Sequence, residues 1–277
     1  NLEDQLRSGA ARLKELIASR SPSVKSDPEL ERLSKLAEAA ESEGAIALAL
    51  QYRDEASAHA DTLLASKQSE ADRLRQDMLD IAGTYAANAT TAVINFDHLH
   101  AADLFSKAYE AVKDWDAVAA LGYKVSQADA LSDRGYYNTD NSALIAALAA
   151  YFEAQGLAPR NSAPFDWARI EDRIGQAMQV LGDRLADPET LLASVEHYRA
   201  ALEVRTEDTV PVEWAKSQNN LANALYSLGA RNNDIGLLEQ SVPAFEASLK
   251  VFTPEAEPIR WVTVASNIAA SQTKIAE

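Results

Sequence analysis

Apolar side chains along most of this chain recur at intervals of three and four residues, which is the spacing of one face of an α-helix. Two such series flank Gly229. The first series is Trp214, Leu221, Ala224, Leu225 and Leu228, and the second is Leu238, Val242, Phe245 and Leu249. The pattern predicts two consecutive helices joined by a turn. The Ala-rich composition, with only 10 Gly in 277 residues, extends the prediction to an all-α chain.

The same pattern recurs at a fixed distance. Pro164-Phe165-Asp166-Trp167 returns as Pro211-Val212-Glu213-Trp214 and as Pro258-Ile259-Arg260-Trp261, in steps of 47 residues. Self-similarity at such a period is typical of stacked helical repeats. We predict units near 117–163, 164–210 and 211–257. A final helix at 258–277 is expected to cap the stack, because an end unit needs a polar outer side.

Particular positions within the unit predict where its helices begin and end. Gly135, Gly182 and Gly229 coincide, and a Gly near the end of a helix can adopt the left-handed conformation that closes it. Asp187-Pro188-Glu189 is a strong helix start, because Asp accepts from free backbone N–H groups and Pro has none to lose. Pro243 removes a backbone hydrogen bond, so we expect residues 236–243 to be irregular.

The residues of these units resemble the tetratricopeptide repeat (TPR) family. In that family a large and a small residue adjoin in the first helix, and small, aromatic and small residues follow in the second. The matching residues are Leu221-Ala222, Leu225, Gly229, Ser241, Phe245 and Ser248, and one unit earlier Ile174-Gly175, Met178, Gly182, Ser194, Tyr198 and Ala201. At 47 residues the unit exceeds the usual 34 and looks like the long-unit variety of large bacterial proteins.

The resemblance implies an architecture and a binding surface. The architecture is a right-handed superhelical solenoid of antiparallel helix pairs. The surface is a concave groove, lined by the first helices, that holds an extended or helical peptide. Counted from Leu221, the groove positions are Arg169, Asp172, Gln176 and Gln179 in one unit and Lys216, Asn219, Asn223 and Tyr226 in the next, with Asp129 and Ser266 continuing the row. Amide side chains suit such a surface, because each can pair with a peptide backbone of any sequence. Alternatively, these residues are ordinary polar surface.

Before the regular units the pattern is looser. Residues 1–113 are predicted to form an N-terminal region of degenerate TPR-like helix pairs, and residues 114–277 the regular repeats. The expected helices of the N-terminal region are 1–20, 28–42, 45–66, 69–93 and 97–112. Pro22 and Pro28 bracket the best candidate for a linker.

Charge and composition narrow the class of partner. The formal net charge is −16, which argues against nucleic acid and anionic membranes and favours a neutral or basic protein or peptide. The chain has no Cys and no long apolar run, so we expect no disulfides, no membrane insertion and a cytoplasmic location. It begins at Asn1 rather than Met, which is compatible with a fused effector domain in a full-length protein.

No arrangement of side chains predicts an enzyme, a cofactor or a metal. His98 and His100 stand beside Asp97, but residues two apart on a helix point in nearly opposite directions, so a helix start and surface positions are expected. His59 and His197 have neighbours at spacings that point away from them. The three repeated Trp residues, Trp167, Trp214 and Trp261, are expected to pack between adjacent units rather than to form a stacking platform.

These observations support three functional hypotheses. The first is a non-catalytic interaction scaffold that binds a partner segment on its concave face. The second is a sensor or regulatory arm of a larger bacterial signalling or effector protein, and the third, weaker one is a self-assembly module. The clamp that holds a C-terminal carboxylate in some family members has only Arg169 and Lys216 as counterparts, and these lie in different units.

Overall fold

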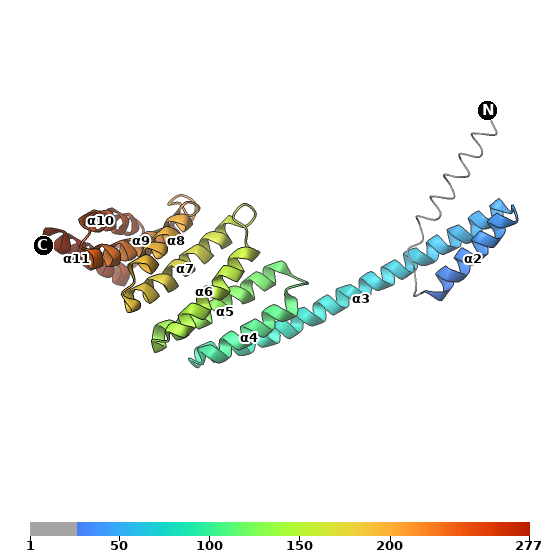
Figure 1. Ribbon diagram of the computed structural model, residues 1–277, viewed down its shortest axis with the longest axis horizontal. Helices are drawn as coiled ribbons and strands as arrows, with labels where there is room; N and C mark the ends of the chain where they lie inside the picture. Colours follow the sequence, from blue (N-terminus) through green and yellow to red (C-terminus); the bar gives the residue numbers. More distant parts are fainter. Residues whose placement is uncertain (1–26) are drawn as a thin grey trace, which may run out of the picture. The chain divides into compact units, whose positions relative to one another are not determined.

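Helices make up all the regular structure in the described part of the chain, as the apolar pattern predicted. The computed structural model describes residues 27–277, so the predicted helix at 1–20 lies outside the described residues (Figure 1). The helices are α2 (Pro28–Ser42), α3 (Ile46–Ile94), α4 (His98–Val112), α5 (Ala117–Asn138), α6 (Asn141–Leu157), α7 (Pro164–Leu185), α8 (Pro188–Leu202), α9 (Pro211–Asn232), α10 (Ile235–Leu249) and α11 (Pro258–Ala276).

The chain divides into two compact units, Asn1–Leu74 and Arg75–Glu277. The division falls within α3, so the second unit contains the end of that helix and α4 as well as the regular repeats. In the first unit, Asp27 caps α2 and its Oδ1 atom lies 3.0 Å from Nε2 of His59 on α3. No helix within residues 27–277 combines the length and the apolar character needed to cross a membrane.

Helix α3 corrects one sequence prediction. Two helices were expected, at 45–66 and 69–93, whereas a single helix of 49 residues runs from Ile46 to Ile94. The expected break at Ser66-Lys67-Gln68-Ser69 contains neither Gly nor Pro. Because none of these side chains removes a backbone donor or clashes with the preceding turn, nothing there ends the helix.

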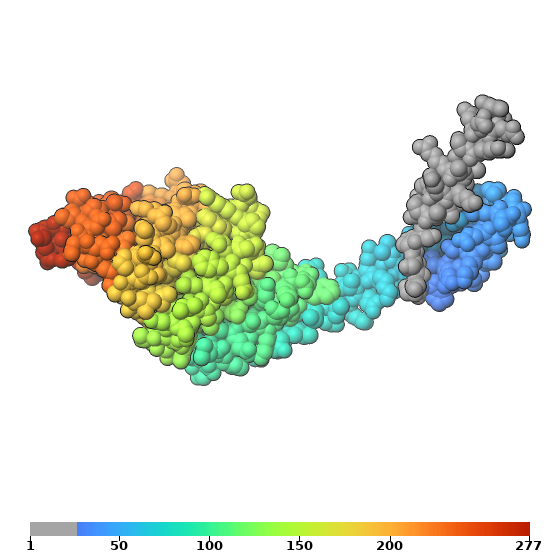
Figure 2. Space-filling view, viewed as in Figure 1, coloured from blue at the N-terminus to red at the C-terminus, as the bar shows by residue number. Residues whose placement is uncertain are grey.

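The second unit is a stack of helix pairs. Helix α5 packs against α6, α7 against α8 and α9 against α10, while α6, α8 and α10 pack against the helix that follows each of them. Helices α5, α7, α9 and α11 also contact one another in succession. In the space-filling view the residues of this unit follow the same order, from cyan through green, yellow and orange to red (Figure 2). The predicted solenoid of antiparallel helix pairs is confirmed.

One aromatic ring fills the interior of each pair. Tyr151, Tyr198 and Phe245 occupy equivalent positions in α6, α8 and α10, and all are fully buried. They are the aromatic members of the small–aromatic–small pattern. Burying an aromatic ring of this size is expected to contribute about 1.5 to 3 kcal/mol.

The repeated glycines have a different role from the one predicted. Helices α5, α7 and α9 continue past Gly135, Gly182 and Gly229, and the left-handed residues that end them are Thr139, Ala186 and Asn233. A Cβ atom on Gly182 would lie 2.9 Å from Cγ of Leu191, and one on Gly229 would lie 3.0 Å from Cγ of Leu238. The glycines therefore permit close contact between paired helices and do not terminate them.

The starts of the second helices follow the prediction more closely. Asp187 accepts a hydrogen bond of 3.0 Å from the backbone N–H of Glu189, and α8 begins at Pro188. The expectation of an irregular segment at 236–243 is wrong, because α10 runs through Pro243 without interruption. Pro243 is exposed, and packing of the opposite face, which includes fully buried Phe245, holds the helix in place.

Candidate functional site

The predicted groove residues converge in one pocket of about 540 Å³ in the second unit. Five of the eight lie in its wall: Arg169, Asp172 and Gln176 from α7, and Lys216 and Asn219 from α9. The other residues of the lining are Arg173, Arg205, Glu213, Asn220, Phe252, Arg260, Thr263 and Val264. Successive contacts among α7, α9 and α11 explain why residues one and two units apart meet here.

The remaining predicted residues lie outside the lining of this pocket. Gln179 accepts a hydrogen bond of 3.1 Å from the hydroxyl of Tyr198, and Asn223 accepts one of 3.0 Å from Nδ2 of Asn267. Tyr226 is half-buried on α9. Of these, Gln179 and Asn223 hold neighbouring helices together.

The two residues predicted to continue the row also lie outside the pocket. Asp129 accepts a hydrogen bond of 2.6 Å from the Tyr151 hydroxyl and lies 3.4 Å from Nε of Arg173. Ser266 donates to the carbonyl of Val262 on its own helix. The site is therefore confined to α7, α9, α11 and the two segments that contain Arg205 and Phe252.

A buried polar triad joins two residues of the pocket lining, Asp172 and Arg205, through Ser217, which is not part of the lining. The Ser217 hydroxyl donates to Oδ1 of Asp172 at 2.8 Å and accepts from Nη1 of Arg205 at 2.8 Å. The same Nη1 lies 3.5 Å from Oδ1 of Asp172. All three residues are buried, and Ser217 is fully so.

Two members of the triad, Ser217 and Arg205, replace apolar residues at equivalent positions in adjacent units, whereas Asp172 corresponds to Val125 and Asn219. Ser217 corresponds to Ile170 and Val264, both buried. Arg205 corresponds to Ala158 and Phe252, which are also buried. The sequence reasoning missed Ser217 and Arg205, because groove positions were counted only along the first helices. A polar residue where the aligned copies are apolar was the signal that could have found both.

Burial sets the electrostatics of the triad. Loss of water raises the pKa of Asp172, and the Arg205 charge and the Ser217 hydrogen bond offset this only in part. Burial likewise lowers the pKa of Arg205, against the opposing effect of Asp172. Each charge thus depends on the other, since an isolated buried charge is strongly unfavourable.

Asn219 contributes a polar atom with no partner of its own. Its Oδ1 is buried and makes no hydrogen bond within residues 27–277, although the residue lines the pocket. A buried acceptor left unpaired is costly, and such atoms in folded proteins are nearly always satisfied. Because this atom has almost no accessible surface, a donor on a ligand would satisfy it only once the Asn219 amide turns toward the pocket.

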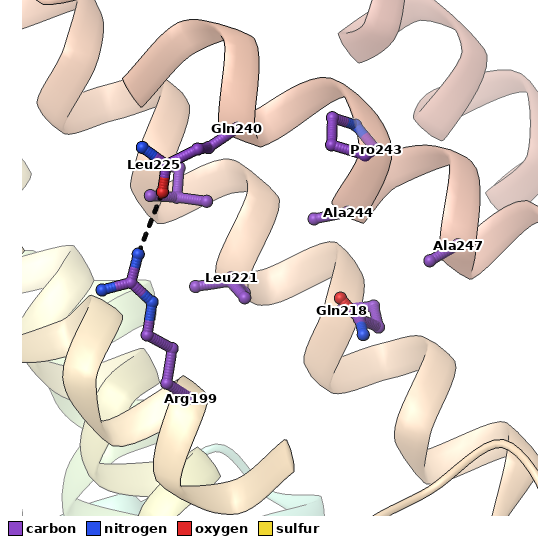
Figure 3. Close-up of a pocket in the computed structure, with 8 residues that line it drawn as sticks. All are labelled: Arg199, Gln218, Leu221, Leu225, Gln240, Pro243, Ala244 and Ala247. Carbon is purple, nitrogen blue, oxygen red and sulfur yellow. Dashed lines mark hydrogen bonds between the residues drawn. The ribbon is translucent and has the colours of Figure 1, made fainter. Parts of the chain in front are cut away.

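A second, smaller pocket of about 360 Å³ lies between α8, α9 and α10 (Figure 3). Its apolar wall includes Leu221 and Leu225, and at one end Arg199 donates a hydrogen bond of 3.1 Å to Oε1 of Gln240. Gln218, Ala244 and Ala247 line the rest of it, beside Pro243.

The two earlier repeat units show why no side chain fills this smaller pocket. Lys124, equivalent to Gln218, pairs with Glu153 at 2.7 Å. Glu171, at the same position one unit later, lies 2.6 Å from Nδ1 of His197. Glu153 and His197 correspond to Ala247 and Ala244, so Gln218 has only methyl groups opposite it. The pocket is a by-product of small residues at two positions.

The histidines depart from the sequence interpretation. His59 meets the carboxylate of Asp27, the residue that caps α2, and His197 meets that of Glu171 on α7, contacts that local spacing could not reveal. His98 starts α4 as expected, yet it is buried and stacks on Tyr137, so its predicted surface position is wrong. Among residues 27–277 no group of His, Cys, Asp and Glu side chains is placed to hold a metal ion.

Of the repeated tryptophans, Trp214 has the packing role predicted. It is buried in a cluster with Phe245, Phe252 and Val264, and Val264 belongs to the following unit. Trp167 and Trp261 are half-buried, and the guanidinium of Arg160 lies 4.8 Å from the centre of the Trp167 ring. These contacts stabilise the stack.

Comparison with known proteins adds no identification. No protein-family model matches the chain, and no curated protein matches it. The pocket and the repeat pattern are the features of this chain that bear on its function.

Proposed function

We propose that this chain is a non-catalytic protein-interaction scaffold of the tetratricopeptide type. It binds an extended or helical segment of a partner protein on the face formed by α7, α9 and α11. The observation that carries the proposal is the convergence of five predicted groove residues, from two different units, on one pocket. Because successive contacts bring α7, α9 and α11 together, residues of two units can present their polar groups to one ligand.

The chemistry of the pocket supports a peptide segment as the ligand. Gln176, Asn219 and Asn220 offer amide donors and acceptors, which match those of a peptide backbone. Phe252 and Val264 add apolar surface at the base. Polar groups fixed around an apolar base are usual in ligand pockets.

The test is a comparative pull-down from the native lysate with mass spectrometry. The groove variant combines Gln176→Ala, Asn219→Ala and Thr263→Ala, one change on each of the three helices. The control combines Gln68→Ala, Gln76→Ala and Thr84→Ala, three exposed positions on α3.

We expect at least one protein to be captured by the parent and by the control but not by the groove variant. Capture of the same proteins by all three would contradict binding at this face. Circular dichroism must first show that each variant has the helix content of the parent. Loss of a captured protein can then be attributed to the groove and not to unfolding.

A further inference from the structure

The charge of the pocket is opposite to that of the whole chain. The full sequence carries 26 Lys and Arg against 42 Asp and Glu. The lining of the pocket carries five basic side chains, Arg169, Arg173, Arg205, Lys216 and Arg260, and only two acidic ones, Asp172 and Glu213. A cationic hollow in an anionic protein concentrates anionic groups locally, because the low-dielectric walls focus the field.

Arg205 on the pocket lining retains free donor capacity. A guanidinium has five N–H donors in a fixed fork. The side-chain contacts that Arg205 makes within the described residues, to Ser217 and Asp172, involve Nη1. Arg205 is only 7% exposed, and its contacts with Ser217 and Asp172 fix the orientation of its side chain. Because Arg205 lines the pocket, its remaining N–H donors are held in one position there.

The basic side chains at the rim are either unpaired or weakly paired. Lys216 forms no ion pair with any described residue, and Arg169 lies 3.0 Å from Asp166, both side chains being half-exposed. Arg173 lies 3.4 Å from Asp129, and Arg260 lies 3.7 Å from Glu257. These pairs involve half-exposed side chains, and such pairs contribute little to stability. An incoming carboxylate can therefore replace their partners.

The unpaired acceptor of Asn219 favours a peptide over a simple anion as the ligand of this pocket. Its buried Oδ1 accepts no hydrogen bond within residues 27–277 and needs a donor. An isolated carboxylate brings only acceptors, and an inorganic phosphate dianion brings a single O–H donor, whereas a peptide backbone brings a series of N–H donors together with any acidic side chains.

We infer that the pocket between α7, α9 and α11 binds an internal acidic segment of a partner protein. Carboxylate side chains of the segment contact Arg205 and the basic rim, while a backbone N–H donates to Asn219. Arginine suits this task because its fork pairs with a carboxylate through two parallel hydrogen bonds. The inference rests on the proposed function and specifies its partner. It replaces the neutral or basic partner expected from net charge, because a ligand meets the local field of the pocket.

A displayed library of random dodecapeptides, blocked or fused at both ends, tests the charge of the ligand without a free C-terminal carboxylate. The library is selected on the full chain and, in parallel, on the variant with Lys216→Gln and Arg260→Gln. The matched control carries Lys107→Gln and Lys113→Gln, which make the same change in net charge at exposed positions on and just after α4.

Sequences enriched on the parent and on the control, but lost on the pocket variant, are expected to carry a net negative charge. One of them is then synthesised, and its affinity is measured by fluorescence anisotropy. Replacing its Glu and Asp by Gln and Asn is expected to weaken binding by about tenfold or more, since each charge-assisted hydrogen bond is worth a factor of about ten. Raising the salt concentration is expected to weaken it further.

Each other outcome points to a distinct conclusion. Pocket-dependent sequences of neutral or positive charge would overturn the acidic ligand while leaving the groove function intact. Sequences that bind equally to the pocket variant would overturn both proposals. Equal binding of the peptide and its amide analogue would overturn the role of the carboxylates, and competition by inorganic phosphate alone at the same concentration would replace the peptide by a simple anion.

Discussion

Single side chains determine how closely the helices of each pair approach each other and where charged groups are buried between the helices. Gly182 and Leu191 face each other across α7 and α8, with no room for a methyl group between them. Across this unit and the next, the triad of Asp172, Arg205 and Ser217 places two polar residues, Arg205 and Ser217, where the flanking copies are apolar and buried. The glycine positions keep the repeat regular, whereas the triad distinguishes the contact between these two units from the equivalent contacts.

Gly182→Ala is expected to destabilise the protein by about 1 to 3 kcal/mol, the usual cost of overpacking a core. The new Cβ would lie 2.9 Å from Cγ of Leu191 and 3.0 Å from its backbone nitrogen, so α8 must shift. Urea unfolding followed by circular dichroism measures the change. Gly122→Ala is the control, because nothing lies within 4 Å of its Cβ position and Ala favours a helix over Gly by about 1 kcal/mol. Equal effects of the two changes would disprove the close-contact role.

Asp172→Asn is expected to change how stability depends on pH. Burial raises the pKa of Asp172 in the folded state above its ordinary value of 3.8, so the folded protein binds this proton more tightly than the unfolded chain does. The contribution of the carboxyl group to stability is then greatest below pH 3.8 and falls as pH rises through the folded-state pKa.

The measurement is the free energy of unfolding of the parent minus that of Asp172→Asn across the acidic range. This difference should decrease as pH rises. Asp208→Asn, at an exposed loop position, controls for net charge and should give a nearly constant difference. A difference that increases with pH for Asp172→Asn would show that Arg205 and Ser217 outweigh desolvation.

At the scale of helices, length and continuity follow from which residues are able to stop a helix. Helix α3 runs for 49 residues because its middle offers no Gly or Pro, and α10 runs through Pro243 because packing on its buried face compensates for the missing bond. Proline in a helix interior removes the hydrogen bond to the carbonyl four residues earlier, here that of Glu239. Tertiary contacts therefore override a local preference in α10.

Pro243→Ala is expected to stabilise the protein by up to about 3 kcal/mol, because it restores that hydrogen bond and improves helix propensity. Thermal and urea unfolding measure the gain. Glu246→Ala, an exposed change on the same helix, should alter stability by no more than about 0.5 kcal/mol. A loss of stability on removing Pro243 would mean that its ring contributes packing at the pocket beside Ala244 and Gln218.

At the scale of the molecule, the second compact unit contains its own apolar core. Its described core clusters extend from Met78 on α3 to Ile268 on α11 and lie wholly within residues 75–277. The pocket also belongs to this unit. In a stack of repeats stability arises mainly from contacts between neighbours, so removing a distant segment leaves most of it unchanged.

A fragment of residues 75–277 is therefore expected to fold cooperatively and to keep the melting temperature of this unit. A fragment beginning at Ala117 lacks the end of α3 and α4, which cover Ala120 and Ala130, and is expected to be less stable. Circular dichroism measures the melting temperatures of the two fragments. The comparison tests whether the domain boundary lies at 74/75, as the compact units indicate, or at 113/114, as the regularity of the repeats predicted. Equal melting temperatures would favour the later boundary.

Much of the fold and part of the site follow from local sequence. The start of α8 at Asp187-Pro188 and the row of groove positions on α7 and on α9 depend on residues a few positions apart, and the 47-residue period is read directly by aligning the sequence with itself. Helical spacing places such residues on one face whatever surrounds them. The sequence therefore predicted five residues of the pocket before any contact was known.

The sequence by itself determined the helices, their repeat and the face that carries the candidate site, because these depend on spacing along the chain. Only the tertiary structure decided that Gly182 serves contact, that His197 meets Glu171 and that Arg205 reaches Asp172 through Ser217. The tertiary structure also showed that the pocket is basic in an acidic chain. Each of these depends on atoms brought together from different helices, and the free energy of burying a charge depends on that assembled environment.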